Sequence, residues 1–325
     1  MTEKPRVLVT SWLVRESEPA IQVLRDAGCE VVLGRSPRPR TAQDMAEAVR
    51  GIDGIVAGSD NYSAPVLNAA DRLKVIVRVG VGYDTVDLAV ATSKGIQVGT
   101  TPGTNQDAVA DYAFGLILAL ARRIVSHHNS TAAGEWRREP GPDVWRKTIG
   151  IVGAGAIGRG VARRARGFDM NVLLYDVVQD QAWASNLGVR YAGLDEVFRQ
   201  ADYVTLHAPL LPATRNLVNA ERLATMKPTA YLVNTARGEL VDLDALVAAL
   251  RNKTIAGAAL DVFPKEPPTG HPILAMENVI VSPHVAGGSI EANIAGGTMA
   301  AESVVAVLRG GRVAHCVNPE VHARA

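Results

Sequence analysis

The sequence has little cysteine and no motif that cysteine commonly supports. Its 325 residues include two cysteines, Cys29 and Cys316, which lie far apart and outside any CxxC or Cys/His cluster. A disulfide framework and a zinc site are therefore not indicated. We expect a cytoplasmic protein with reduced thiols and no structural metal.

Neither charge is in excess, and no apolar run is long. The 34 lysines and arginines nearly balance 33 aspartates and glutamates, without a long run of one sign, so nucleic acid is not an expected partner. Glu3, Lys4 and Arg6 interrupt the N-terminal segment before it could form a secretory signal. The most apolar stretch, residues 112–121, is about half the length needed to cross a bilayer. We expect no membrane association and interpret this stretch as a buried helix.

Hydrophobic residues, by contrast, make up 47 % of the chain, and its length favours two domains. Before the first long helix, apolar segments of strand length alternate with helical ones at residues 6–10, 30–33, 54–57 and 75–79. This alternation is typical of a parallel sheet covered by helices. Gly28 and Gly51 stand where two of the intervening helices should end.

A second series of strand-like segments follows a predicted helix at residues 106–123 and a loop containing glycine and proline. Its members are TIGIVG, NVLLYD, YVTLHAP, AYLVNTA, TIAGAALDV and NVIVSPH. A last helix is predicted at residues 289–308, and its pattern does not say where it docks. The predicted fold class is α/β, with two doubly wound parallel sheets.

A glycine-rich string, GAGAIG at residues 153–158, has the GxGxxG form. The string alone is weak evidence, but here it follows a strand, opens a helix and precedes a second strand ending at Asp176, 18 residues after Gly158. Gly153 permits a tight turn, Gly155 lets a pyrophosphate approach the backbone, and Gly158 brings helix and strand together. The alternative is an ordinary glycine turn with a surface aspartate.

The acidic residue at the end of the second strand bears on the cofactor. The Asp176 carboxylate can accept hydrogen bonds from a ribose 2′-hydroxyl, whereas it would repel a 2′-phosphate. Residues 177–180 include no arginine or lysine to bind such a phosphate. We therefore predict NAD rather than NADP.

Three polar residues follow strands of the second series: Arg237, Glu266 and His284. In open α/β sheets this edge binds ligands. A guanidinium can hold a carboxylate bidentately, a histidine can exchange a proton near neutral pH, and a nearby glutamate favours the protonated imidazole. Together they suit hydride transfer to a 2-oxo acid. Each also has an ordinary interpretation, as a surface charge, a solvated loop acid or a buried imidazole.

The chain resembles the D-isomer-specific 2-hydroxyacid dehydrogenase family, which includes D-3-phosphoglycerate dehydrogenase, hydroxypyruvate and glyoxylate reductases and D-lactate dehydrogenase. The resemblance runs almost from end to end. It rests on RVGVGYDTVD at 78–87, TPGTNQDAVADYA at 101–113, GIVGAGAIG at 150–158, HAPLLPATRNLVN at 207–219, VNTARGELVD at 233–242, LDVFPKEP at 260–267 and SPHVAGG at 282–288.

The resemblance implies a catalytic trio of Arg237, Glu266 and His284, and substrate binding by Val81, Gly82 and Arg237. The implied cofactor contacts, in addition to the three motif glycines, are Ala156, Ile157, Asp176, Ala208, Thr235, Ala236, Asp261, His284 and Gly287. It also implies a flavodoxin-like substrate domain of residues 1–102 and 289–325, a Rossmann NAD-binding domain of residues 103–288, and a homodimer formed through the latter.

Two departures concern the substrate. Gly58 and Asp60 stand where phosphoglycerate dehydrogenases carry an arginine toward the phosphate, so a phosphorylated substrate is less expected. Glu266 replaces the glutamine of formate dehydrogenases, which favours a small 2-hydroxy or 2-oxo acid such as glyoxylate or hydroxypyruvate. The alternatives are a dehydrogenase-like NAD-sensing binding protein and a phosphite or formate dehydrogenase. The identity of the acid and the physiological direction stay open.

Overall fold

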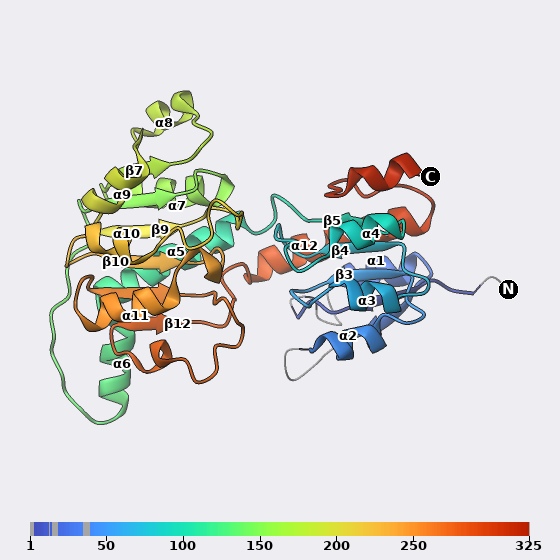
Figure 1. Cartoon of the computed structure of the whole chain (residues 1–325), viewed down its shortest axis with the longest axis horizontal. Helices are drawn as coiled ribbons and strands as arrows, with labels where there is room; N and C mark the ends of the chain where they lie inside the picture. The colour runs from blue at the N-terminus through green and yellow to red at the C-terminus, as the bar shows by residue number, and fades with distance from the viewer. Residues whose placement is uncertain (1–2, 13, 15–18, 35–39, 325) are drawn as a thin grey trace. The chain divides into compact units, whose positions relative to one another are not determined.

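The computed structural model describes residues 3–12, 14, 19–34 and 40–324. The chain divides into two compact units (Figure 1). Unit 1 consists of Met1–Asn105 and Gly288–Ala325, and unit 2 of Gln106–Gly287. The sequence-based prediction places the domain boundaries after residues 102 and 288.

Unit 1 is built on a five-stranded parallel sheet in the order β2-β1-β3-β4-β5. The order is that of flavodoxin-like folds, in which the order of the strands across the sheet reverses between two inner strands, here β1 and β3. The predicted class of this unit is thereby confirmed. The strands are β1 (Arg6–Val9), β2 (Glu30–Leu33), β3 (Gly54–Ala57), β4 (Val75–Arg78) and β5 (Gln97–Gly99).

Helices cover both faces of this sheet and bury a separate apolar core on each. One face carries α2 (Ala42–Ala48), α3 (Ala64–Ala69) and α4 (Leu88–Ser93), and the other carries α1 (Pro19–Asp26) and α12 (Ile290–Leu308). A short 3-10 helix, Pro319–Arg324, ends the described chain. A Cβ on Gly54 would lie 2.7 Å from Val304 Cγ1, so this glycine lets α12 pack directly on β3.

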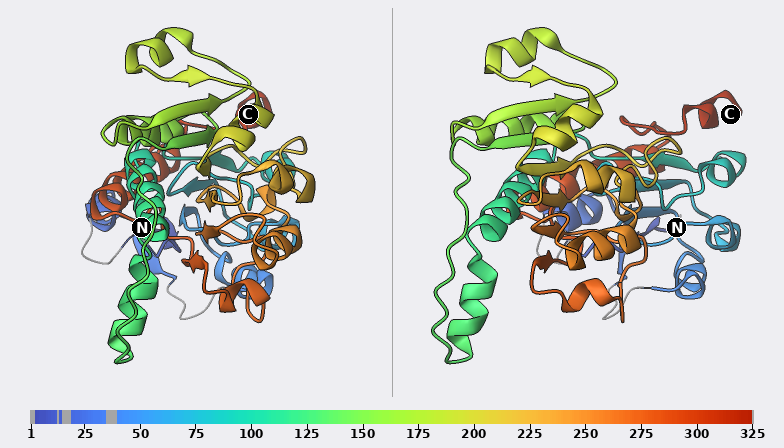
Figure 2. Two further views of the ribbon diagram at one scale, coloured as in Figure 1. Left: turned by 90° about the vertical axis from the view of Figure 1, so that its left-hand side faces the viewer. Right: turned by 60° about the vertical axis from the view of Figure 1, so that its left-hand side comes forward.

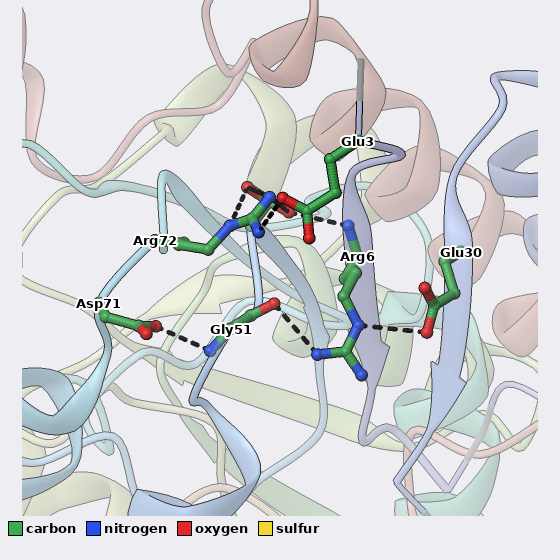
Figure 3. Close-up of polar contacts among 7 residues, drawn as sticks. Glu3, Arg6, Glu30, Gly51, Asp71 and Arg72 are labelled. Atoms are coloured by element: carbon green, nitrogen blue, oxygen red, sulfur yellow. Dashed lines mark hydrogen bonds and ion pairs between the residues drawn. The ribbon is translucent and has the colours of Figure 1, made fainter. Parts of the chain in front are cut away.

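A network of hydrogen bonds and ion pairs lies at the amino end of the unit 1 sheet (Figure 3). Arg6 binds Glu30 through Nε and the Gly51 carbonyl through Nη1, and the Gly51 N–H binds Asp71. The buried carboxylate of Asp53 accepts the Arg6 N–H at 2.8 Å. Arg72 binds that carboxylate as well.

Unit 2 contains a seven-stranded parallel sheet in the order β12-β11-β10-β9-β6-β7-β8. This is the Rossmann arrangement, with the reversal of strand order between β6 and β9, and it confirms the second predicted sheet. The strands are β6 (Thr148–Val152), β7 (Asn171–Tyr175), β8 (Arg190–Tyr191), β9 (Tyr203–Leu206), β10 (Tyr231–Asn234), β11 (Gly257–Leu260) and β12 (Val279–Val281).

The helices of unit 2 likewise enclose two cores, one on each face of the sheet. They are α5 (Gln106–Ala121), α6 (Ile124–Ala132), α7 (Ala156–Arg166), α8 (Gln181–Leu187), α9 (Leu194–Gln200), α10 (Ala220–Thr225) and α11 (Leu243–Arg251), with 3-10 turns at Gly238–Leu240 and Pro272–Ala275. No helix in the described part of the chain is both long and apolar enough to cross a membrane.

One segment of unit 2 was not expected from the sequence. The predicted helix at 106–123 ends at Ala121, and a second helix, α6, begins after Arg123, whose φ is +54°. A left-handed residue cannot continue an α-helix, so it separates the two. Figure 2 shows α6 and the loop that follows it extending away from the sheet of unit 2.

Candidate active site

The glycine string lies between β6 and α7, beside the loop that follows β9. Gly153 has φ +101°, and a Cβ there would lie 2.6 Å from the His207 carbonyl carbon. A Cβ on Gly158 would lie 1.9 Å from the Gly153 carbonyl oxygen, whereas one on Gly155 would have no atom within 4 Å among those described. Two glycines are thus required by packing, and the third leaves open space beside the N-terminus of α7.

That space has the features a dinucleotide requires. Gly155 is the N-cap of the 11-residue helix α7 and has no side chain to occupy the helix N-terminus, where backbone N–H groups favour a phosphate. Asp176 follows β7, and its carboxylate accepts the Ala154 N–H at 2.7 Å and the Val178 N–H at 3.0 Å. These bonds fix the carboxylate beside the glycine string. The residues present therefore fit a nicotinamide dinucleotide.

Two buried polar atoms at the same sheet edge lack a partner. Thr235 Oγ1, after β10, and His207 Nδ1, after β9, have no hydrogen bond within the described residues. Buried polar groups are rarely left unpaired, so such atoms mark a place where a ligand can bind. The other nitrogen of His207 lies 2.9 Å from Thr205 Oγ1, and burial lowers the pKa of His207 to about 3. This histidine is therefore neutral near pH 7.

A buried amide shapes the loop that carries Arg237. Asn234, the last residue of β10, accepts the Ala236 N–H at 3.0 Å and donates to the Arg237 carbonyl at 2.7 Å. A Cβ on Gly238 would lie 2.0 Å from the Phe263 carbonyl carbon. The Arg237 loop is therefore packed directly against the backbone that leads to Glu266.

Glu266 and His284 lie in direct contact. His284 Nδ1 is 2.9 Å from Glu266 Oε2 and 3.2 Å from Oε1. The two side chains are 40 % and 38 % exposed, so the pair lies at the surface of unit 2 and not in its core. Glu266 Oε1 also accepts the Phe263 N–H at 3.1 Å, which fixes the carboxylate relative to its own loop.

The charge state of Glu266 follows from these neighbours. Partial burial raises its pKa, but the hydrogen bond and charge of His284, the Phe263 N–H and the charge of Arg237 outweigh burial and lower it. The carboxylate therefore stays ionised at neutral pH. The influence of Arg237 on this pKa also places the three predicted catalytic side chains in one electrostatic neighbourhood.

A second buried carboxylate holds the His284 loop in place. Asp261 is fully buried after β11; it accepts the Ser282 hydroxyl at 2.6 Å, the Val285 N–H at 2.9 Å and the Ala286 N–H at 2.8 Å. Its own carbonyl accepts the His284 N–H at 2.8 Å. His284 has φ +54°, an unfavourable conformation for a residue with a side chain. The Asp261 network maintains this strained backbone.

The remaining predicted residues occupy two sheet edges. In unit 2, Ala156 and Ile157 form the first turn of α7, Ala208 follows β9, and Gly287 ends the unit. Val81 and Gly82 follow β4 of unit 1, where the Gly82 carbonyl accepts Arg78 Nε at 3.0 Å. Within the described residues, no three His, Cys, Asp or Glu side chains gather as a metal site.

Sequence reasoning named Asp261 only as a cofactor contact and missed Asn234 and Gly238. The available signal was the position of Asn234 and Asp261, because a polar residue that closes or follows a buried strand usually shapes the next loop. Gly238 had no such signal, since its contact comes from a segment about 25 residues away.

Known proteins share this architecture. The family model described as the NAD-binding domain of D-isomer specific 2-hydroxyacid dehydrogenases matches residues 114–286. The chain is 40 % identical to a glyoxylate reductase of Thermofilum pendens, over 98 % of this chain and 96 % of that protein.

Solved structures are similar over nearly the whole length. A crystal structure of a Thermus thermophilus protein has a TM-score of 0.87 and 38 % identity, covering 96 % of this chain and 99 % of that one. An NADPH-dependent glyoxylate/hydroxypyruvate reductase of Sinorhizobium meliloti, in complex with NADP and malonate, has a TM-score of 0.83 and 30 % identity, covering 98 % of each chain.

Proposed function

This chain belongs to the D-isomer specific 2-hydroxyacid dehydrogenase family, and we propose that it transfers a hydride between NAD(H) and C2 of a small 2-oxo or D-2-hydroxy acid. Family membership makes it an oxidoreductase with a nicotinamide cofactor. The observation that carries the finer proposal is the hydrogen-bonded pair of His284 and Glu266 in the electrostatic neighbourhood of Arg237.

Each of the three side chains has a separate role in the reduction. Bound nicotinamide supplies the hydride. The Arg237 guanidinium binds the substrate carboxylate and orients C2. His284, held through Nδ1 by Glu266, donates a proton from Nε2 to the substrate oxygen as the ketone becomes an alcohol. Glu266 is the positioning residue that orients the His284 ring through Nδ1, and oxidation reverses each of these steps.

NAD is the proposed cofactor because Asp176 is fixed beside the glycine string by two backbone N–H groups. In that position it can bind a ribose 2′-hydroxyl and repel a 2′-phosphate. Replacing Asp176 with serine should raise the ratio of kcat/KM for NADPH to that for NADH by about 100-fold. An unchanged ratio would show that another residue selects the cofactor.

The substrate we propose is glyoxylate, hydroxypyruvate or a similar short acid. A full-length relative is named glyoxylate reductase, and a similar structure is named glyoxylate/hydroxypyruvate reductase. Gly58 supplies no cation for a phosphate, and a Cβ there would lie 3.0 Å from Ser11 Cα and 3.1 Å from the Thr10 carbonyl oxygen, so a larger side chain would require these backbone atoms to shift. Val81 and Gly82 would bind the substrate carboxylate through their backbone.

The test is an assay of 2-oxo acids with NADH, using the unmodified chain and His284→Ala. We expect turnover of glyoxylate or hydroxypyruvate and a fall in kcat of about 100- to 10,000-fold in the variant. His315→Ala, which removes an exposed histidine of unit 1, is the matched control and should retain activity. Nucleotide-dependent oligomerisation without turnover would instead identify a binding protein.

We also propose a cytoplasmic homodimer formed through unit 2. The projecting segment of α6 and the following loop exposes Ile124, Val125, Trp136 and Trp145, with Trp136 74 % exposed. Large exposed apolar side chains on a projecting segment are typical of a protein interface. Light scattering should give a dimer for the unmodified chain and a monomer for Trp136→Asp combined with Ile124→Asp; a monomeric unmodified chain would contradict the proposal.

A further inference from the structure

An ion pair is buried at the carboxyl end of the unit 1 sheet. Arg40 Nη1 lies 2.8 Å from Asp60 Oδ1, and the two side chains are only 10 % and 12 % exposed. Arg40 comes after β2 and Asp60 after β3, so both lie at the edge where parallel α/β sheets bind ligands. Val81 and Gly82, assigned above to the substrate carboxylate, follow β4 at the same edge.

Hydrogen bonds connect the loops at this edge. Thr10 Oγ1, after β1, accepts the Gly58 N–H at 3.0 Å and lies 2.9 Å from the buried Tyr62 hydroxyl. Arg78 donates to the Gly82 carbonyl at 3.0 Å and to the Ala57 carbonyl at 3.4 Å, which joins the loops after β3 and β4. The loop after β3, which carries Asp60, is therefore joined by hydrogen bonds to the segment proposed to bind substrate.

Several charged groups at this edge affect the pKa of one side chain, Tyr62. Burial raises the pKa of Tyr62 and Asp60 raises it further, whereas the hydrogen bond to Thr10 and the charges of Arg78 and Arg40 oppose the rise. Two cations and one carboxylate thus act electrostatically on a single buried hydroxyl. Because they are largely shielded from water and salt, removing any one of them changes the local potential strongly.

We propose that Asp60 is a specificity-determining residue, which by pairing with Arg40 makes this edge favour 2-oxo acids with an uncharged remainder over those that carry a second anionic group. Because the Arg40 guanidinium is paired with Asp60, it attracts a second anionic group less strongly, and the Asp60 carboxylate repels that group. This inference rests on the proposed function, since it concerns selection among substrates of that reaction.

The two members of the pair should act in opposite directions. The probes are oxaloacetate and 2-oxobutanoate, which differ in having a carboxylate or a methyl group at the end remote from C1. In Asp60→Asn the cation is released, and the ratio of kcat/KM for oxaloacetate to that for 2-oxobutanoate should rise at least about tenfold. In Arg40→Gln the carboxylate is released, and the ratio should fall.

The double variant and a control at the other end of the sheet complete the design. Arg40→Gln combined with Asp60→Asn removes both charges, so it should lose the gain seen in Asp60→Asn. Asp53→Asn makes the same change of charge in unit 1 at a carboxylate paired with Arg72, and its ratio should stay within about twofold of the unmodified chain. Thermal unfolding of each variant shows which of them are folded, and Arg40→Gln tests the proposal if Asp60→Asn does not fold.

The outcomes separate this inference from the proposed function. If the unmodified chain reduces no 2-oxo acid, the proposed function fails. If it reduces glyoxylate or 2-oxobutanoate but the folded variants at Asp60 and Arg40 leave the ratio unchanged, or show no gain with oxaloacetate, only the present inference is overturned. A gain that persists in the double variant would overturn it too, because Arg40 would not be its source.

Discussion

Asp53, at the amino end of the unit 1 sheet, and Glu266, at the carboxyl end of the unit 2 sheet, are both paired with a cation but in different surroundings. Asp53 is 4 % exposed and binds both the Arg6 N–H and the Arg72 guanidinium. Glu266 is partly exposed, and its partner His284 has a left-handed backbone. The first site satisfies its polar groups by hydrogen bonds and ion pairs, whereas the second holds the backbone of a residue that can exchange a proton in an unfavourable conformation.

The two sites differ in whether their polar groups contribute to folding stability or are completed by a ligand. Buried and fully paired groups contribute to folding stability, because removing one partner leaves the other without a hydrogen bond. Strained or unpaired groups lower stability and persist where a ligand completes the site. The carboxyl end of unit 2, with Thr235 Oγ1 and His207 Nδ1 unpaired within the described residues, is of the second kind.

Replacing arginine with lysine near each of these two carboxylates gives the largest expected difference in effect. Arg237→Lys should lower kcat/KM for a 2-oxo acid by about 100- to 1,000-fold with little change in Tm, because an ammonium cannot bind a carboxylate bidentately. Arg72→Lys should leave kcat/KM unchanged and lower the unfolding free energy by about 1 kcal/mol. Steady-state kinetics and urea unfolding measure the two effects. A loss of activity in Arg72→Lys would contradict the assignment of Arg72 to folding stability alone.

A smaller contrast concerns two buried carboxylates. Asp261→Asn places an amide against groups that donate hydrogen bonds, so the His284 loop should shift and kcat should fall by about 100-fold. Asp53→Asn should lower the unfolding free energy by about 1 to 2 kcal/mol without affecting kcat. The dissociation constant for NADH distinguishes the roles of Asp261, since loss of loop geometry alone lowers kcat more than it weakens cofactor binding.

The sequence predicted strands with apolar runs well and short or polar elements poorly. The expected segments 30–33 and 54–57 coincide with β2 and β3, because apolar runs between turn residues leave little choice of boundary. The two-residue strand β8 and the edge strand β5 were not predicted, since their pairing depends on a neighbour and not on their own pattern. Helix α6 was missed because its sequence, IVSHHNSTA, is mostly polar and exposed.

For the candidate site, the sequence indicated which residues share an edge but not how they are held. Arg237, Glu266 and His284 follow strands of one parallel sheet, whose carboxyl ends must lie together. The hydrogen bonds that the Asp261 carboxylate accepts from residues more than 20 positions away depend on side-chain direction and loop path, which no local pattern encodes. The left-handed backbone of His284 has the same origin.

The smallest expected effect concerns the pH dependence of Glu266. Its neighbours lower its pKa below the usual value of about 4.3, so its stabilising contact with His284 is complete above that value and is lost as the pH falls through the lower folded-state pKa. Glu266→Gln lacks the charge at every pH. Its reductive kcat/KM should be about tenfold lower near pH 7, because the imidazole loses the carboxylate that orients it, and it should lack the fall that protonation of the native carboxylate causes at acidic pH. The difference between the two proteins in unfolding free energy should shrink as the pH falls through the folded-state pKa, where the native carboxylate becomes protonated. Overlapping pH profiles of kcat/KM would show that Glu266 acts on stability alone and resembles Asp53.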